Sequence, residues 1–273
     1  MLGRRVLFLR LSLALLIICS LVLFVMIWSQ DDIIFPVQAV GASPPLPPGG
    51  ERLQVKSADG DTLHGVHIPP VDAGSARKTL IVGFGGNAWN GEDVASYLGG
   101  VYPSADIVTF HYRGYRPSTG KPSADALLAD APLVFDAAAK RVPTKRTVVV
   151  GFSIGTGVAA SLANQRRMSG MILVTPFDSL KKVASETYPW LPVGLFFEHE
   201  FDAAGALKGS DVPVAIIAAE RDELIPAART DALRKVVPNL VFDRTIERAG
   251  HNDIYSNSEF QGAMDEALES IFR

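Results

Sequence analysis

Ser153 is the central residue of a G-x-S-x-G motif over residues 151–155. The β-branched apolar run 148–150 precedes the motif, and the small residues of 156–163 follow it. This pattern predicts a strand, a sharp turn and a helix, and the glycines two positions before and after the serine suit a turn too tight for side chains there. A serine at such a turn exposes its hydroxyl at the edge of a sheet, where the oxygen can serve as a nucleophile.

Two later loops carry the groups that such a serine needs. A hydroxyl is a poor nucleophile at neutral pH, so it requires a base and a group that orients the base. Asp222 follows the apolar run 214–219, and His251 follows the run 240–246 within a turn that contains glycine. We therefore predict Ser153 as the nucleophile, His251 as the general base and Asp222 as the residue that orients it.

Other ionisable residues have simpler interpretations. Glu223 is adjacent to Asp222, and a loop can aim only one of the two inward, so we expect Glu223 to be a solvated loop acid. Asp253 is expected to cap the final helix. The remaining histidines are expected to be structural or on the surface, and they are His64, His67, His111 and His199.

A nucleophilic attack on a carbonyl also needs donors for the developing negative oxygen. One predicted donor is the backbone N–H of Ile154, directly after the nucleophile. The second is predicted in the loop 85–90, Gly-Gly-Asn-Ala-Trp-Asn, because glycines let a backbone approach a substrate closely. We predict the N–H of Asn87 as this donor, with a simple turn as the alternative interpretation of the loop.

Strand-like and helix-like segments alternate over residues 51–273, a size that suits one α/β domain. A helical period is visible between 125 and 141, where Pro132 would kink the helix or mark a late start, and a last helix is expected over 259–273. We predict a mostly parallel, doubly wound sheet of about eight strands. The strands are a hairpin of 52–56 and 64–68, then 80–84, 107–112, 147–150, 171–175, 214–219 and 240–246.

Residues 1–30 predict a membrane anchor. The run 11–28 has no charge and is long enough for one crossing. Its flanks are Arg4, Arg5 and Arg10 before the run and Asp31 and Asp32 after it. Basic residues favour the cytoplasmic side, so we expect a cytoplasmic N-terminus and a periplasmic or lumenal domain. A cleaved signal peptide is the alternative, although it usually has a shorter apolar core with a small-x-small site close behind.

Residues 31–50 predict a linker, because the stretch 41–50 holds four prolines and three glycines. A proline-rich ligand for a recognition module is the alternative. The formal net charge is −3 and the basic residues are scattered, so we expect no nucleic-acid partner. Cys19 is the single cysteine, and no Cys/His cluster has zinc spacing. We therefore predict no disulfide, no metal and no organic cofactor.

Several further stretches accompany these candidate residues, namely His-Tyr-Arg-Gly-Tyr at 111–115, Ser-Thr-Gly-Lys-Pro-Ser at 118–123, Pro-Phe-Asp-Ser at 176–179, Tyr-Pro-Trp-Leu-Pro at 188–192, Phe-Asp at 201–202, Arg-Asp-Glu-Leu-Ile-Pro at 221–226 and Gly-His-Asn-Asp at 250–253. With them, residues 51–273 resemble the α/β-hydrolase superfamily. The resemblance extends to its BEM46/ABHD13-like group of membrane-anchored serine hydrolases, related to the serine aminopeptidase and monoglyceride-lipase-like branch. It implies an α/β-hydrolase fold, the catalytic triad Ser153, Asp222 and His251, and an oxyanion hole formed by Asn87 and Ile154.

The chain departs from this family's pattern at two positions. The family usually has histidine before the Gly-Asn pair of the oxyanion loop, where this chain has Gly85, and it tends to have glycine where this chain has Arg116. A short cap is expected over 178–209, and its aromatic and aliphatic residues include Tyr188, Trp190, Leu195, Phe196 and Phe197. These side chains could form an acyl pocket or pack the cap onto the sheet, and the shortness of the cap argues against a large enclosed pocket.

Together, the residues and the resemblance predict a membrane-anchored serine hydrolase of esterase, thioesterase or lipase type. It would cleave an ester, thioester or amide of a small-molecule or lipid-like acyl substrate through an acyl-enzyme, with esters expected before peptides. A catalytically silent, membrane-tethered interaction domain is one alternative, and Gly85 favours it. An acyltransferase is another, because the same acyl-enzyme would serve it.

Overall fold

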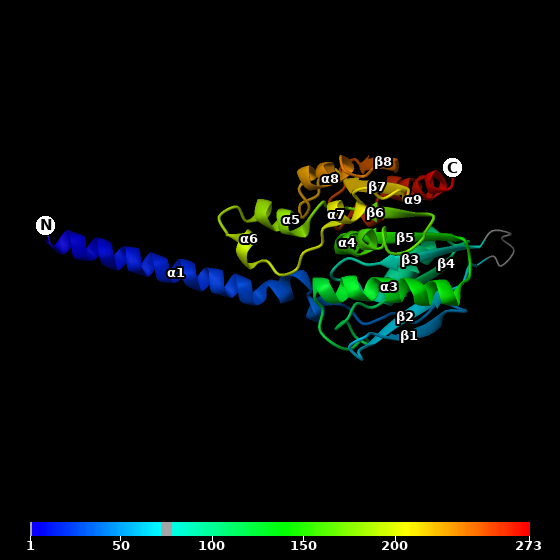
Figure 1. Ribbon diagram of the computed structural model, residues 1–273, viewed down its shortest axis with the longest axis horizontal. Coiled ribbons are helices and arrows are strands. Elements are labelled where there is room, and N and C mark those ends of the chain that lie inside the picture. The colour runs from blue at the N-terminus through cyan, green and yellow to red at the C-terminus, as the bar shows by residue number, and fades with distance from the viewer. Residues whose placement is uncertain (1, 72–77) are drawn as a thin grey trace.

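The computed structural model describes residues 2–71 and 78–273, and its centre is an eight-stranded sheet in the order β1-β2-β4-β3-β5-β6-β7-β8 (Figure 1). The pairs β1–β2 and β2–β4 are antiparallel and the others are parallel. Each predicted segment overlaps one observed strand, so the predicted fold class is confirmed. The strands are β1 (Glu51–Lys56), β2 (Thr62–Ile68), β3 (Thr79–Phe84), β4 (Asp106–Phe110), β5 (Arg146–Phe152), β6 (Gly170–Val174), β7 (Val214–Ala219) and β8 (Leu240–Ile246).

Helices cover both faces of the sheet, which is why its central strands are continuous apolar runs. In β5, Val148 and Val150 face one side and Val149 faces the other, and all three are fully buried. The helices α2 (Gly91–Val101) and α9 (Ser258–Ile271) pack on the first face. The second face is covered by α3 (Ala124–Arg141), α4 (Ile154–Ser161), α7 (Ala203–Leu207) and α8 (Ala227–Arg234).

The starts of two helices differ from the sequence-based expectations. Pro132 lies inside α3 without marking its start, which is set by Ser123, whose Oγ accepts the N–H of Ala126 at 3.1 Å. At α9 the cap is Asn257, whose Oδ1 accepts the N–H of Glu259 at 2.9 Å. The prediction that Asp253 caps this helix is therefore wrong, because α9 begins after an intervening 3₁₀ turn.

The segment predicted as a cap, residues 178–209, lies between β6 and β7. It contains α5 (Leu180–Thr187) and α6 (Val193–Phe196), and α7 returns the chain to the sheet. In Figure 1, α5 and α6 lie beyond the end of the sheet from which α1 also projects. The cap is therefore placed on the side of the domain that faces the N-terminal helix.

The N-terminal helix α1 (Leu2–Ile34) contains the predicted anchor run 11–28 and extends beyond it. By length and composition α1 is apolar enough to cross a membrane. Its last turn and the residue that follows are docked on the domain, because Gln30 and Phe35 are buried. The C-terminal end of α1 is thus packed against the domain and is not joined to it only through a flexible linker.

Residues 35–50 join α1 to β1 along the surface of the domain, and the first four residues of the predicted linker 31–50 belong to α1. Ser43 Oγ donates to Glu92 Oε2 at 2.7 Å, and the side-chain amide of Asn90 donates to the carbonyl of Gly41 at 3.3 Å. Both partners lie at the start of α2. Polar groups at this helix terminus therefore hold the proline-rich segment in place.

Glu92 is a buried carboxylate at the junction of these segments. It pairs with His111 at the end of β4 and accepts from Arg52 Nη1 of β1 at 2.8 Å. Burial opposes its ionisation, but hydrogen bonds from His111 and Ser43 outweigh this effect and lower the pKa of Glu92 from 4.5 to about 2. The ionised carboxylate therefore stabilises the folded state above pH 4.5, and this stabilisation is lost as the pH falls towards 2.

We expect Glu92→Gln to lower the free energy of unfolding by about 2–3 kcal/mol at pH 7, since the neutral amide cannot replace the charge. The deficit relative to wild type should shrink between pH 4.5 and pH 2, where wild type becomes protonated. Urea unfolding of the full chain in detergent at a series of pH values measures both effects. Glu269→Gln, on the exposed side of α9, is the control; an unchanged deficit at low pH would contradict the assignment.

Candidate active site

Ser153 occupies a strained turn between β5 and α4. Its backbone has φ 51° and ψ −118°, a conformation that costs a non-glycine residue free energy and persists only when the surroundings enforce it. An added Cβ at Gly151 would lie 2.5 Å from the carbonyl oxygen of Gly155, and one at Gly155 would collide with the carbonyl oxygen of Phe84. Both glycines of the motif are therefore required by close backbone packing.

The three residues predicted as nucleophile, base and orienting acid form one hydrogen-bonded chain. His251 Nε2 lies 2.9 Å from Ser153 Oγ, and His251 Nδ1 lies 2.8 Å and 2.9 Å from the two carboxylate oxygens of Asp222. The imidazole and the carboxylate are both buried. Because the carboxylate can only accept, Nδ1 carries the hydrogen and Nε2 is left to accept from the serine hydroxyl.

The loop after β7 fixes the position of this carboxylate. Asp222 Oδ1 also accepts the backbone N–H groups of Leu224 at 3.0 Å and Ile225 at 2.7 Å. These bonds close an Asx-type turn on the side chain and leave it few rotamers. The imidazole of His251 therefore meets a carboxylate whose orientation is set within its own loop.

Two acids that sequence reasoning placed elsewhere hold the histidine loop. Glu223, expected to be solvated, accepts the backbone N–H of His251 on Oε2 at 3.0 Å, and Asp253 accepts the N–H of Gly250 on Oδ1 at 2.6 Å. Glu223 can do so because adjacent side chains leave the chain in different directions, and the loops after β7 and β8 are neighbours. Glu223 is exposed, as predicted for a solvated loop acid, but it also makes a hydrogen bond to the histidine loop that the sequence did not predict.

The predicted oxyanion loop lies beside the serine. An added Cβ at Gly86 would lie 3.6 Å from Ser153 Cβ. Two tyrosines hold the loop: Tyr112 Oη donates to the carbonyl of Gly85 at 2.7 Å, and Tyr115 Oη donates to the carbonyl of Asn87 at 2.8 Å. Burial raises the pKa of both phenols, which keeps them protonated as donors. No role was predicted from the sequence for these two tyrosines. Their place in the 111–115 motif was the feature from which such a role could have been predicted.

Ile154 is the first residue of α4, so its backbone N–H has no acceptor within that helix. Asn87 and Ile154 thus lie on the two segments next to Ser153, which is the arrangement that an oxyanion hole requires.

Gly85 is enclosed by apolar side chains. A Cβ at this position would lie 2.7 Å from Val94 Cγ2 and 3.2 Å from Trp89 Cβ. The indole of Trp89 packs against the rings of Phe152 and Tyr255, with centroid distances of 5.3 Å and 4.8 Å. A histidine would not fit here, and the aromatic cluster around Trp89 occupies the space next to the loop.

The other histidines lie outside the site, as predicted, and each has a local partner. His67 Nε2 is 2.7 Å from Asp106 Oδ1, and His199 Nε2 is 2.6 Å from Asp31 Oδ1. His111 pairs with Glu92. His64 Nδ1 lies 3.3 Å from the side-chain amide of Gln54. Over residues 2–71 and 78–273, no group of three His, Cys, Asp or Glu side chains is arranged to hold a metal ion.

A family model described as the alpha/beta hydrolase fold matches residues 80–210, which include the serine turn and the cap. The chain belongs to the α/β-hydrolase superfamily. An uncharacterized protein of Mycobacterium tuberculosis is 29% identical over 233 residues, covering 83% of this chain and 82% of that protein. The mouse protein named alpha/beta hydrolase domain-containing protein 17C is 31% identical over 185 residues, covering 67% of this chain and 57% of its own length.

Solved structures share the fold of this α/β hydrolase. An esterase of Pyrococcus furiosus superposes with a TM-score of 0.64 at 18% identity and covers 85% of this chain and 97% of its own. An alpha-beta hydrolase of Vibrio vulnificus has the same TM-score and identity, with 82% and 81% covered. The fold and these neighbours support a hydrolase. The narrower resemblance to the BEM46/ABHD13-like group stays a prediction.

We expect Gly85→Ala to lower the free energy of unfolding by about 1–3 kcal/mol, since its methyl group would press on Val94. Gly100→Ala is the matched control, because a Cβ there meets nothing within 4 Å and a helical alanine is favoured over glycine. Thermal unfolding of the two variants beside wild type measures the contrast. Equal stability of the two variants would contradict the crowding at Gly85.

Proposed function

We propose that this protein is a membrane-anchored serine hydrolase that cleaves an ester or thioester through Ser153. The observation that carries the proposal is the buried hydrogen-bonded chain from Asp222 through His251 to Ser153 Oγ. The strained serine turn supports it, because such strain is kept where it positions a reacting group. The hydrolase fold and the esterase among its structural neighbours agree with this class of reaction.

The proposed reaction has two halves. Ser153 Oγ attacks the carbonyl carbon while His251 Nε2 takes the hydroxyl proton, and Asp222 stabilises the resulting imidazolium. The bond to the alcohol or thiol breaks, and the leaving group receives that proton from His251. Water then attacks the acyl-enzyme, with His251 as the base, and the acid is released as Ser153 recovers its proton.

The N–H groups of Ile154 and Asn87 are the proposed donors to the carbonyl oxygen while it carries negative charge. Their support is the position of Gly86 beside Ser153 and the start of α4 directly after it. Tyr115, by holding the carbonyl of Asn87, would fix the peptide between Asn87 and Ala88, which follows the Asn87 N–H directly in the chain. Fixed donors of this kind stabilise the developing charge without having to reorganise.

The anchor and the substrate class belong to the same proposal. The apolar run of α1 would cross the bilayer once, and the arginines before it favour a cytoplasmic N-terminus with the hydrolase domain on the other side. The cap exposes large apolar side chains next to this helix, including Trp190 and Leu195. A lipid-like acyl substrate fits such surroundings better than a polar one does.

Ser153→Ala is expected to abolish labelling by a fluorophosphonate probe and to lower p-nitrophenyl ester turnover by about 10³-fold or more. Wild-type protein should be labelled at Ser153, as mass spectrometry of the modified peptide would show. Equal labelling of the variant would exclude Ser153 as the nucleophile. Wild type that neither labels nor turns over any ester would favour a silent interaction domain.

The two adjacent acids should differ sharply in their effect on catalysis. Asp222→Asn is expected to lower kcat by about 10³–10⁴-fold, because an amide no longer holds the required tautomer of His251. Glu223→Gln should keep kcat within about tenfold, because the amide oxygen still accepts the N–H of His251. Steady-state ester hydrolysis measures both variants, and a reversed order would assign the orienting role to Glu223.

A further inference from the structure

Burial along α1 follows the helical period near its C-terminal end. Within residues 21–34 the partly or fully buried residues are Leu23, Met26, Ile27, Ser29, Gln30 and Ile34, and all of them except Ser29 lie at the spacing of one helix face. Their neighbours on the other side are exposed, and they include Phe24, Val25 and Trp28. One face of the anchor helix therefore lies against the domain at the end of the predicted membrane run.

Polar contacts fix this arrangement between α1 and the cap. The side chain of Gln30 accepts the N–H of Glu198 at 3.1 Å and donates to the carbonyl of Phe196 at 3.4 Å. One residue later, Asp31 pairs with His199, and the ring of Phe35 packs edge-on against that imidazole with a centroid distance of 5.1 Å. The helix is thus held by directional bonds as well as by apolar packing.

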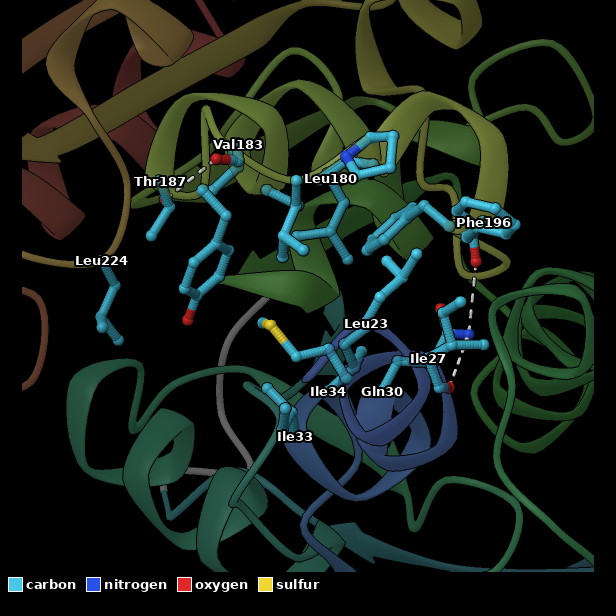
Figure 2. Close-up of a pocket in the computed structure, with 17 residues that line it drawn as sticks. Leu23, Ile27, Gln30, Ile33, Ile34, Leu180, Val183, Thr187, Phe196 and Leu224 are labelled. Atoms are coloured by element: carbon cyan, nitrogen blue, oxygen red, sulfur yellow. Dashed lines mark hydrogen bonds between the residues drawn. The ribbon is translucent and has the colours of Figure 1, made fainter. Parts of the chain in front are cut away.

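A cavity of about 250 Å³ separates this face of α1 from the cap (Figure 2). One wall is α1, with Leu23, Met26 and Ile27, and the opposite wall is α5 and α6. Its lining is apolar except for a few groups at its margins, such as Thr187 and the clamped Gln30. The sequence predicted that so short a cap could not enclose a large pocket, and here the anchor helix supplies the missing wall.

The cavity borders the loops that hold the candidate catalytic residues. Leu224 lines it, and the N–H of Leu224 bonds to Asp222 Oδ1. Leu180 lines it as the first residue of α5, shortly after β6, whose Val174 carbonyl accepts the N–H of Ser153 at 3.0 Å. The cavity therefore lies beside the loop that holds Asp222 and beside the start of α5.

We propose that this cavity binds the hydrocarbon chain of an acyl ester that resides in the bilayer, so that α1 is a wall of the substrate site as well as an anchor. The inference rests on the proposed serine hydrolase. The residues of α1 that line the cavity indicate which ligand it binds. Leu23, Met26 and Ile27 belong to the run proposed to cross the membrane, so the medium beside them is hydrocarbon. A chain that enters along α1 leaves lipid for apolar side chains without crossing water.

The test is chain-length selectivity of the full protein in lipid nanodiscs. Ala184→Trp fills the cavity from α5, and Met26→Trp fills it from α1. For both variants we expect kcat/KM for p-nitrophenyl dodecanoate to fall about tenfold or more, while that for the butyrate stays within about threefold. Val25→Trp, on the exposed face of α1, is the matched control and should change neither value.

Retained butyrate turnover shows that the filled variants are folded. An equal change for both esters, or no change for either, would overturn the acyl pocket and leave the serine hydrolase standing. If Ala184→Trp also lost butyrate turnover, the ratio of dodecanoate to butyrate turnover in Met26→Trp would decide whether the cavity is an acyl pocket.

A second measurement keeps the pocket separate from catalysis. The Ser153→Ala protein in nanodiscs is irradiated with a dodecanoyl ester whose chain ends in a diazirine, and the cross-linked peptides are mapped. We expect adducts on 23–27 and 180–187 that Ala184→Trp removes and Val25→Trp keeps. Adducts that are indifferent to Ala184→Trp would overturn the inference. Pocket adducts in a protein that hydrolyses no ester would support the hydrocarbon site and contradict the proposed function.

Discussion

The backbone of Ser153 is the constraint on which the rest of the site depends. A non-glycine residue at φ 51° is held there by three features. β5 lies in the centre of the sheet, the N–H of Ser153 bonds to the carbonyl of Val174, and Gly151 and Gly155 pack closely against the neighbouring backbone. Such strain costs about 1–3 kcal/mol, which the packed sheet must offset. In return, the hydroxyl stands clear of its own strand, within reach of an imidazole from another loop.

The remaining parts of the site are held by contacts between loops. Glu223 ties the loop after β7 to the backbone of His251, and Tyr112 and Tyr115 tie the loop 85–90 to the segment after β4. The bond from Tyr112 to the carbonyl of Gly85 is buried, and such a bond is worth more than an exposed one. Gly85 fits the same scheme, because the Trp89 cluster fills the space that a side chain there would need. The departure from the family's usual histidine is thus accompanied by a packed alternative.

The N-terminal helix and the cap form one packed unit. The apolar stretch of α1 favours the bilayer, yet Gln30, Asp31 and Phe35 lock its end to the cap and to the core. A flexible linker would leave the domain free to turn relative to α1, whereas these contacts fix the orientation of α1 relative to the cap. The cavity lies between α1 and the cap, so it exists only because α1 is docked there. Without α1, the apolar side chains of the cap that line the cavity would be exposed to water.

The eight strands and the order of Ser153, Asp222 and His251 could be predicted from the sequence, because apolar runs, turn glycines and strand ends are local patterns. The partner of Glu223, the hydrogen bonds from Tyr112 and Tyr115 to the loop 85–90, and the docking of α1 became visible only in the folded protein. Those contacts join segments far apart in the chain. In α1 every face is apolar, so no periodicity in the sequence indicates which face is buried. The contact face of α1 can be identified only once the cap is packed against it.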